Sequence, residues 1–274
     1  MKRPKICIFC GVKGNISKEH FWPQWLAAYL SSSTAHISEL HEGLAKQPAV
    51  LQRRSERQGS VVTKKIRAVC TTCNNTWMSA AETKVKPIIL RLLGGSGTVT
   101  VEEASSLAYW VALKSIVGEH ASEGTALTPP QERHAFREQQ SVPYFFRLFL
   151  APHLLQSDSG YYRHSTTIFR ALTGLSPPLP KGISRNIHAT TFLVGKLCFY
   201  VTAIRAAGIN AALLDPRFAM RCIWPLPNQP FQLEALPPLN ALQVQVISRS
   251  LEWVVQHPAV KHGGPLTPEG HRAA

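Results

Sequence analysis

The sequence lacks a long apolar run, and it is also poor in acidic residues. Its 274 residues include 30 Lys and Arg but only 16 Asp and Glu, so the formal net charge is +14. The longest apolar stretch, residues 189–204, is interrupted by Lys196 and contains threonines, which makes it too polar to span a bilayer. The first residues include no apolar core of the length that a signal peptide needs. We therefore expect a cytoplasmic protein without a membrane segment.

The excess of positive charge is concentrated in the N-terminal third of the chain. Up to Arg91 the sequence has fifteen Lys and Arg against five Asp and Glu, and beyond Arg91 it has fifteen against eleven. Clustered cations release counterions when they bind a polyanion, so this asymmetry favours nucleic acid, and DNA in particular, as the partner. The alternative that charge alone leaves open is a basic surface that serves only solubility.

Length and composition predict a folded α+β protein of two parts. The apolar content of 45% is ordinary for a globular protein and argues against disorder. We place a zinc-containing module at 1–95 with an insertion at about 31–67, a mixed α+β domain at 100–258, and a flexible tail at 259–274. The spacing of apolar residues predicts helices at 23–30, 73–86, 101–117, 129–140 and 241–256, and strands at 144–151, 161–169, 187–194, 197–204 and 219–224.

Four of the six cysteines form two Cys-x-x-Cys pairs, Cys7 with Cys10 and Cys70 with Cys73. Four thiolates are the number and kind of ligand that a structural Zn²⁺ prefers. The 59 residues between the pairs do not forbid the site, because closing a loop costs only about 0.6 kcal/mol more for each doubling of its length. The alternative is a redox-active dithiol in either pair, which the basic segment between them disfavours.

The residues next to the cysteine pairs carry a second pattern. Ser17-Lys18-Glu19-His20-Phe21-Trp22-Pro23 follows the first pair, and Cys73-Asn74-Asn75 ends the second. With these motifs the chain resembles the HNH, or His-Me finger, endonucleases in their four-cysteine form. Their pattern is Cys-x-x-Cys, an acidic residue before His-x-x-Pro, and Cys-x-x-Cys-Asn at the head of a helix. The resemblance covers about residues 7–86.

The resemblance implies a ββα-metal, treble-clef-like fold for the N-terminal module and a metal-dependent endonuclease activity. It implies His20 as the general base, Glu19 and Asn74 as ligands of a catalytic Mg²⁺ or Mn²⁺, and Asn75 as the reserve ligand. The chemistry suits these residue types, because imidazole can accept a proton from water near neutral pH. Carboxylate and amide oxygens also suit a hard divalent cation. The chain departs from the family in having no Asn between Pro23 and Cys70, where an Asn often orients the histidine.

The stretch from Lys46 to Arg67 holds seven Lys and Arg and one Glu, and we expect it to bind the phosphate backbone. Its predicted contacts are Arg53, Arg54, Arg57, Lys64, Lys65 and Arg67. Simpler roles stay open: a solvated loop for this stretch, a packing role for His20, and helix N-capping for Asn74 and Asn75. The principal hypothesis is an endonuclease that cuts DNA. The alternatives are a non-catalytic zinc protein that binds DNA or RNA, and a structural zinc protein.

Overall fold

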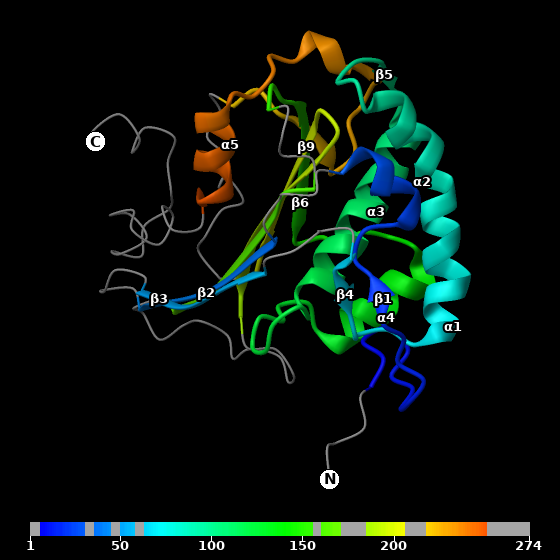
Figure 1. Cartoon of the computed structure of the whole chain (residues 1–274), viewed down its shortest axis with the longest axis vertical. Coiled ribbons are helices and arrows are strands. Elements are labelled where there is room, and N and C mark those ends of the chain that lie inside the picture. Colours follow the sequence, from blue (N-terminus) through cyan, green and yellow to red (C-terminus); the bar gives the residue numbers. More distant parts are fainter. Residues whose placement is uncertain are drawn as a thin grey trace.

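The chain folds around one large sheet that is covered by helices on both faces. The computed structural model describes residues 6–30, 36–44, 50–57, 63–155, 160–170, 185–205 and 218–250. Seven strands lie in the order β10-β6-β9-β8-β7-β2-β3. Helices α2 and α3 lie on one face of this sheet, and α5 lies on the other (Figure 1). The architecture is therefore a mixed α+β fold, as the sequence predicts.

The elements follow one another along the chain with these bounds: β1 (Glu19–His20), the 3-10 helix η1 (Gln24–Tyr29), β2 (His36–Leu44), β3 (Val50–Arg57), β4 (Lys65–Ile66), α1 (Thr71–Cys73), the π-helical turn η3 (Asn74–Met78), α2 (Ser79–Leu92), β5 (Thr98–Val99), α3 (Val101–Gly118), α4 (Pro130–Gln139), β6 (Phe146–Pro152), β7 (Tyr162–Arg170), β8 (Ile187–Val194), β9 (Leu197–Ile204), β10 (Arg221–Trp224), β11 (Phe231–Gln232), the 3-10 helix η4 (Leu233–Ala235) and α5 (Ala241–Ser248). Most of the predicted helices and strands are confirmed within a few residues.

The hairpin of β8 and β9 forms the centre of the sheet, and the sequence predicts its bounds correctly. Its turn consists of Gly195 and Lys196. Gly195 has a φ of +58°, and a Cβ atom there would lie 2.6 Å from the side chain of Leu93. Only glycine tolerates both the left-handed backbone and this close approach without strain. The turn thereby fits beneath the end of α2.

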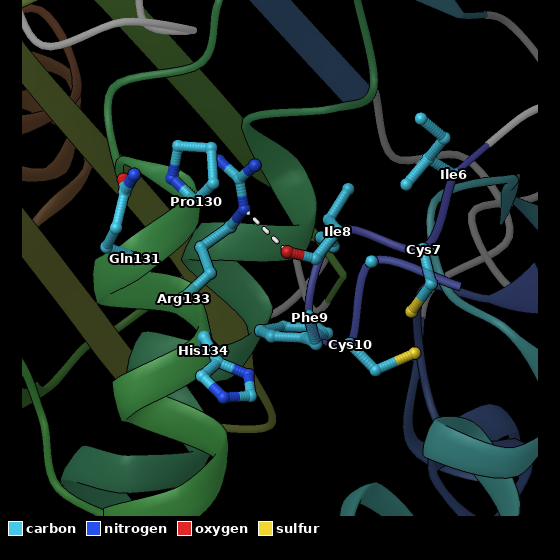
Figure 2. Close-up of a pocket in the computed structure, with 10 residues that line it drawn as sticks. Ile6, Cys7, Ile8, Phe9, Cys10, Pro130, Gln131, Arg133 and His134 are labelled. Atoms are coloured by element: carbon cyan, nitrogen blue, oxygen red, sulfur yellow. Dashed lines mark hydrogen bonds between the residues drawn. The ribbon is translucent and has the colours of Figure 1, made fainter. Parts of the chain in front are cut away.

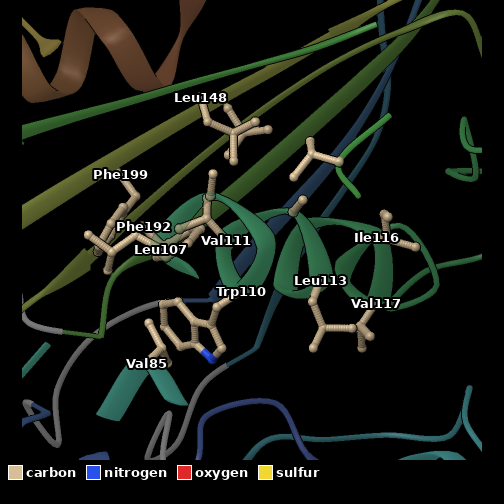
Figure 3. Close-up of a cluster of buried hydrophobic side chains, with 14 of the residues drawn as sticks. Val85, Leu107, Trp110, Val111, Leu113, Ile116, Val117, Leu148, Phe192 and Phe199 are labelled. Atoms are coloured by element: carbon tan, nitrogen blue, oxygen red, sulfur yellow. The ribbon is translucent and has the colours of Figure 1, made fainter. Parts of the chain in front are cut away.

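Helix α3 is buried on nearly all sides, although its sequence predicts an amphipathic helix. The helix begins as predicted with a capping box, in which the Thr100 side chain accepts from the Glu103 backbone N–H. Trp110 extends toward Val85 of α2, and Val111 faces the sheet on the opposite side (Figure 3). A helix that lies between another helix and a sheet has no face toward solvent, which explains why nearly all residues from Ala104 to Gly118 are buried.

Within the predicted insertion at 31–67, residues 36–44 and 50–57 form regular strands. We expect an insertion with little periodicity, but β2 and β3 pair with each other and extend the large sheet. Strand β2 pairs in parallel with β7 along nine residue pairs, from His36 opposite Tyr162 to Leu44 opposite Arg170. A pairing between segments so distant in the chain leaves no local signal, so the sequence does not predict it.

The two predicted domains share one hydrophobic core. Trp22 from the N-terminal module contacts Phe192 of β8 at a ring distance of 5.7 Å. Phe21 likewise contacts Tyr162 of β7 at 4.7 Å. The predicted boundary near residue 95 therefore does not separate two cores. The predicted tail and the end of the predicted helix 241–256 lie outside the described residues. Within the described residues, no helix is both long and apolar enough to cross a membrane.

Candidate metal centre and the adjoining strand pair

The four cysteines of the two Cys-x-x-Cys pairs meet in one cluster. Their sulfur atoms lie within 4.8 Å of one another, and the Sγ atoms of Cys10 and Cys70 are 3.6 Å apart. A tetrahedral zinc with Zn–S bonds of about 2.3 Å needs S···S distances of about 3.8 Å, so the cluster has the right size. Cys7, Cys70 and Cys73 are almost fully buried. The cluster can therefore hold one metal ion, and its four thiols suit zinc.

Local backbone structure presents these sulfur atoms to one another. The first pair lies in a knuckle, residues 6–13, in which Ile6 bridges to Lys13 and the Gly11 N–H donates to the Cys7 carbonyl at 3.0 Å. Gly11 has a φ of +73°, which favours glycine at this tight turn. The second pair opens a helix, because Cys70 is the N-cap of α1 and its sulfur accepts from the Cys73 N–H at 3.4 Å.

The surroundings shift the pKa values of Cys7 and Cys73 in opposite directions. Burial opposes ionisation of the Cys7 thiol, but backbone N–H groups of Cys10, Cys70 and Phe9 outweigh it and lower the pKa to about 7. Burial raises the pKa of Cys73 well above its ordinary value. A bound dication favours all four thiolates, so metal binding would release protons and be weakened by acid.

A two-stranded antiparallel sheet of β1 and β4, which we call the strand pair, lies next to the cluster and carries His20. Strand β1 pairs antiparallel with β4, with Glu19 opposite Ile66 and His20 opposite Lys65. His20 is half-buried, and Lys65 is exposed. The side chain of Glu19, the predicted metal ligand, lies outside the described residues. Three residues separate the end of β4 from Cys70, so the strand pair lies directly next to the metal cluster in the chain.

Asn74 and Asn75 lie in the π-helical turn that follows α1. Because Cys70 is the N-cap, neither Asn caps the start of this helix. The Asn74 side-chain Nδ2 donates to Asn75 Oδ1 at 3.1 Å. That bond engages the Asn75 oxygen and leaves Asn74 Oδ1 without a hydrogen-bond partner among the described residues. Single π-helical turns are rare and are often found at functional sites.

The predicted phosphate contacts differ in their surroundings. Lys65, Arg67 and Arg54 are exposed, and Arg54 pairs with Glu56 at 2.9 Å. Lys64 departs from the predicted surface role, because it is only 8% exposed and its Nζ lies 5.8 Å from the centre of the Tyr162 ring. Side chains alternate across an extended strand, so Lys64 faces inward where Lys65 faces solvent. Arg53 and Arg57 lie in β3, and their side chains are outside the described residues. Sequence reasoning missed a further exposed cation two residues before His20, Lys18.

Arg133 of α4 joins the knuckle to the rest of the fold, and the sequence analysis did not identify it. Its Nε donates to the Ile8 carbonyl at 2.8 Å (Figure 2), and its Nη1 donates to the Thr128 carbonyl. Phe9 adds an edge contact with Trp77 at 4.9 Å. Arg133 lies three residues before Phe136, which places both side chains on the same face of α4. That spacing was the only sequence signal, because the burial of Arg133 depends on contacts with residues far away in the chain.

A buried polar cluster lies where α3 ends against the sheet. Glu119 Oε1 is 3.1 Å from His188 Nδ1, and the carboxylate accepts from the Leu127 N–H, the Thr128 N–H and the Thr128 hydroxyl. Burial alone would raise the pKa of Glu119, but His188 and these donors lower it to about 2. His164 Nδ1 lies 2.7 Å from Thr190 Oγ1. The sequence offered no ligand spacing among these histidines, and their proximity comes from the β7–β8 pairing.

Comparisons of the chain with protein-family models, with curated proteins and with solved structures found no match. Functional interpretation therefore depends on the residues themselves. Three features support a functional interpretation: the four-cysteine cluster, the strand pair that carries His20, and the helical turn that carries Asn74.

Proposed function

We propose that the chain is a metal-dependent endonuclease of the HNH type that hydrolyses phosphodiester bonds of DNA. The observation that carries this proposal is the order of the elements around the cysteine cluster. A strand with His20 pairs with β4, and β4 leads through Cys70 to the helical turn with Asn74. Two antiparallel strands followed by a helix, stapled by two Cys-x-x-Cys pairs, are what a ββα-metal, treble-clef-like module requires.

The zinc and the catalytic cation would have different roles. The four thiols would hold zinc as a structural staple, because a closed Cys₄ site leaves no position for water or substrate. Oxygen ligands from Glu19 and Asn74 would instead hold Mg²⁺ or Mn²⁺, and the free Asn74 Oδ1 favours this residue over Asn75. When bound, such a cation polarises the phosphate and stabilises negative charge on the leaving oxygen.

His20 would act as the general base. Its side chain is only half-buried on the strand pair, so a water molecule can reach it. The ring takes a proton from that water, the water oxygen bonds to phosphorus, and the bond from phosphorus to the leaving oxygen breaks. Lys65 of β4 lies directly opposite His20 of β1, and Arg67 lies two residues after Lys65. Both cations can contact the phosphates that flank the cleaved bond.

Plasmid cleavage tests this proposal. We expect the purified zinc-loaded protein to nick supercoiled plasmid when Mg²⁺ or Mn²⁺ is added, and we expect His20→Ala to abolish nicking. His20→Asn should behave in the same way, because it keeps a polar side chain without a base. Gln139→Ala, an exposed change on α4, is the control. Zinc content should be equal in all four proteins, and nicking that survives in His20→Ala would refute the assignment.

A second candidate function is a zinc protein that binds DNA or RNA without cutting it. The absence of Asn between Pro23 and Cys70 favours this candidate, because nothing of that type can orient His20 from the connecting segment. It predicts salt-sensitive binding and no cleavage with any divalent cation.

A further inference from the structure

A pocket lies between the knuckle and the first turn of α4 (Figure 2). Its volume is about 520 Å³, which is within the range of small-ligand sites. The knuckle side is mainly apolar and consists of Ile6, Cys7, Ile8, Phe9, Cys10 and Gly11, and the helix side consists of Pro130, Arg133 and His134. Gln131 also borders the pocket. The site thus combines apolar walls with an imidazole, an amide and a guanidinium group.

The pocket contains one buried guanidinium group. Arg133 is only 7% exposed, and two of its nitrogen atoms donate to backbone carbonyls, which fixes the side chain in place. Its Nη2 has no hydrogen-bond partner within the part of the chain that the structure describes. On the helix, Glu132 lies 3.8 Å from Arg205.

A backbone hydrogen bond connects the pocket to the segment that follows β4 of the strand pair. The Ile8 N–H donates to the Ala68 carbonyl at 3.0 Å. Arg67 precedes Ala68 and is exposed, and Lys65 lies opposite His20. The extended chain from Lys65 to Ala68 spans about 10 Å at the usual rise per residue. The sugar-phosphate backbone of a nucleic acid bound at His20 can therefore run past Lys65 and Arg67 toward the pocket.

We propose that this pocket holds one unpaired nucleotide of the nucleic acid, so that the protein prefers a junction between duplex and single strand. This inference rests on the proposed function, because it places the nucleotide on the same strand that His20 would attack. A flat base can lie against the His134 ring and the apolar walls, and the Gln131 amide can pair with a base edge. Lys65 and Arg67 can contact the adjoining phosphates. A paired base would first have to be unpaired and unstacked, which costs free energy, so an unpaired base is favoured.

Binding measurements with two DNAs test this inference. Fluorescence anisotropy would give the Kd for a labelled blunt duplex and for the same duplex with a single-stranded tail, with no divalent cation added. We expect wild type to bind the tailed DNA more tightly. The double variant Gln131→Ala/His134→Ala should bind the tailed DNA about tenfold more weakly and the blunt DNA unchanged, because base stacking is lost only in the tail complex. Both changed residues are exposed, so the fold and the zinc content should be retained.

Gln139→Ala on the same helix is the matched control, and it should leave both Kd values unchanged. Equal affinity of wild type for the two DNAs would overturn the inference. An equal loss on both DNAs in the double variant, or no loss on either, would also overturn it. In each of these cases binding to blunt duplex and cleavage at His20 would still stand. Wild type that binds neither DNA would refute the proposed function as well, so the two failures are distinguishable.

Discussion

Acidification should destabilise the fold through the buried histidine cluster, and His164 allows the effect to be isolated. Burial lowers the pKa of His164 from 6.5 to about 3, and the positive charge of His188 adds to the shift. Glu119 at the end of α3 acts in the opposite direction, whereas Lys64 before β4 and His120 after α3 act in the same direction. The folded protein therefore keeps this imidazole neutral over the pH range in which the unfolded chain protonates it.

The sign and size of the effect follow from linkage. Because the folded pKa is depressed, the stability is present above pH 6.5 and is lost as the pH falls toward about 3. Between about pH 7 and about pH 5, the unfolded chain binds most of a proton at this site and the folded chain does not. At about 1.4 kcal/mol per pH unit, His164 accounts for a loss of about 2 kcal/mol over that interval.

Urea unfolding followed by tryptophan fluorescence at the two pH values would measure this loss. We expect wild type to lose about 2 kcal/mol more than His164→Gln does on acidification, whatever the variant costs at neutral pH. The cysteine cluster also binds metal less tightly in acid, but this contribution is common to both proteins and cancels in the comparison. Equal losses in wild type and His164→Gln would refute the account of the buried cluster.

Two further predictions concern the metal centre and its attachment. Cys73→Ser should abolish stoichiometric zinc binding and lower the thermal midpoint strongly, because zinc contributes on the order of 10 kcal/mol to such a site. Cys222→Ser, at a half-buried cysteine outside the cluster, should keep one zinc per chain by elemental analysis; zinc retained in Cys73→Ser would contradict the site. Arg133→Ala should destabilise the protein to urea by about 2–4 kcal/mol, because the Ile8 and Thr128 carbonyls lose a charged donor. Arg137→Ala removes a more exposed arginine of the same helix, paired with Glu138, and should change stability by less than about 0.5 kcal/mol; equal effects of the two changes would contradict the anchoring role of Arg133.

The elements that the sequence predicts well are those whose signals are local. The hairpin at 187–204 follows from two apolar runs around Gly195-Lys196, and the start of α3 follows from the capping box at Thr100. The place of β2 and β3 in the sheet is not predictable in this way. It depends on the parallel pairing of β2 with β7, whose partner lies more than a hundred residues away in the chain.

The same distinction applies to the candidate site. The spacing of the four cysteines predicts their cluster, because zinc imposes a fixed number of ligands on two local motifs. The burial of Lys64 and the anchoring role of Arg133 arise from contacts with β7 and with the knuckle. No local pattern distinguishes these two cations from their neighbours, the exposed Lys65 and the half-buried Arg137. Charge counting along the sequence therefore predicts the basic surface and misses which cations are removed from it.

The most direct test of the central claim is the single-turnover cleavage rate of zinc-loaded wild type and zinc-loaded His20→Ala on DNA with Mg²⁺. The proposed mechanism predicts a rate at least about a hundredfold lower in the variant, since general-base catalysis typically contributes that much or more. It also predicts unchanged zinc content and unchanged affinity for DNA. Equal rates in the two proteins would contradict the role of His20, and no cleavage by wild type with either Mg²⁺ or Mn²⁺ would contradict the nuclease itself.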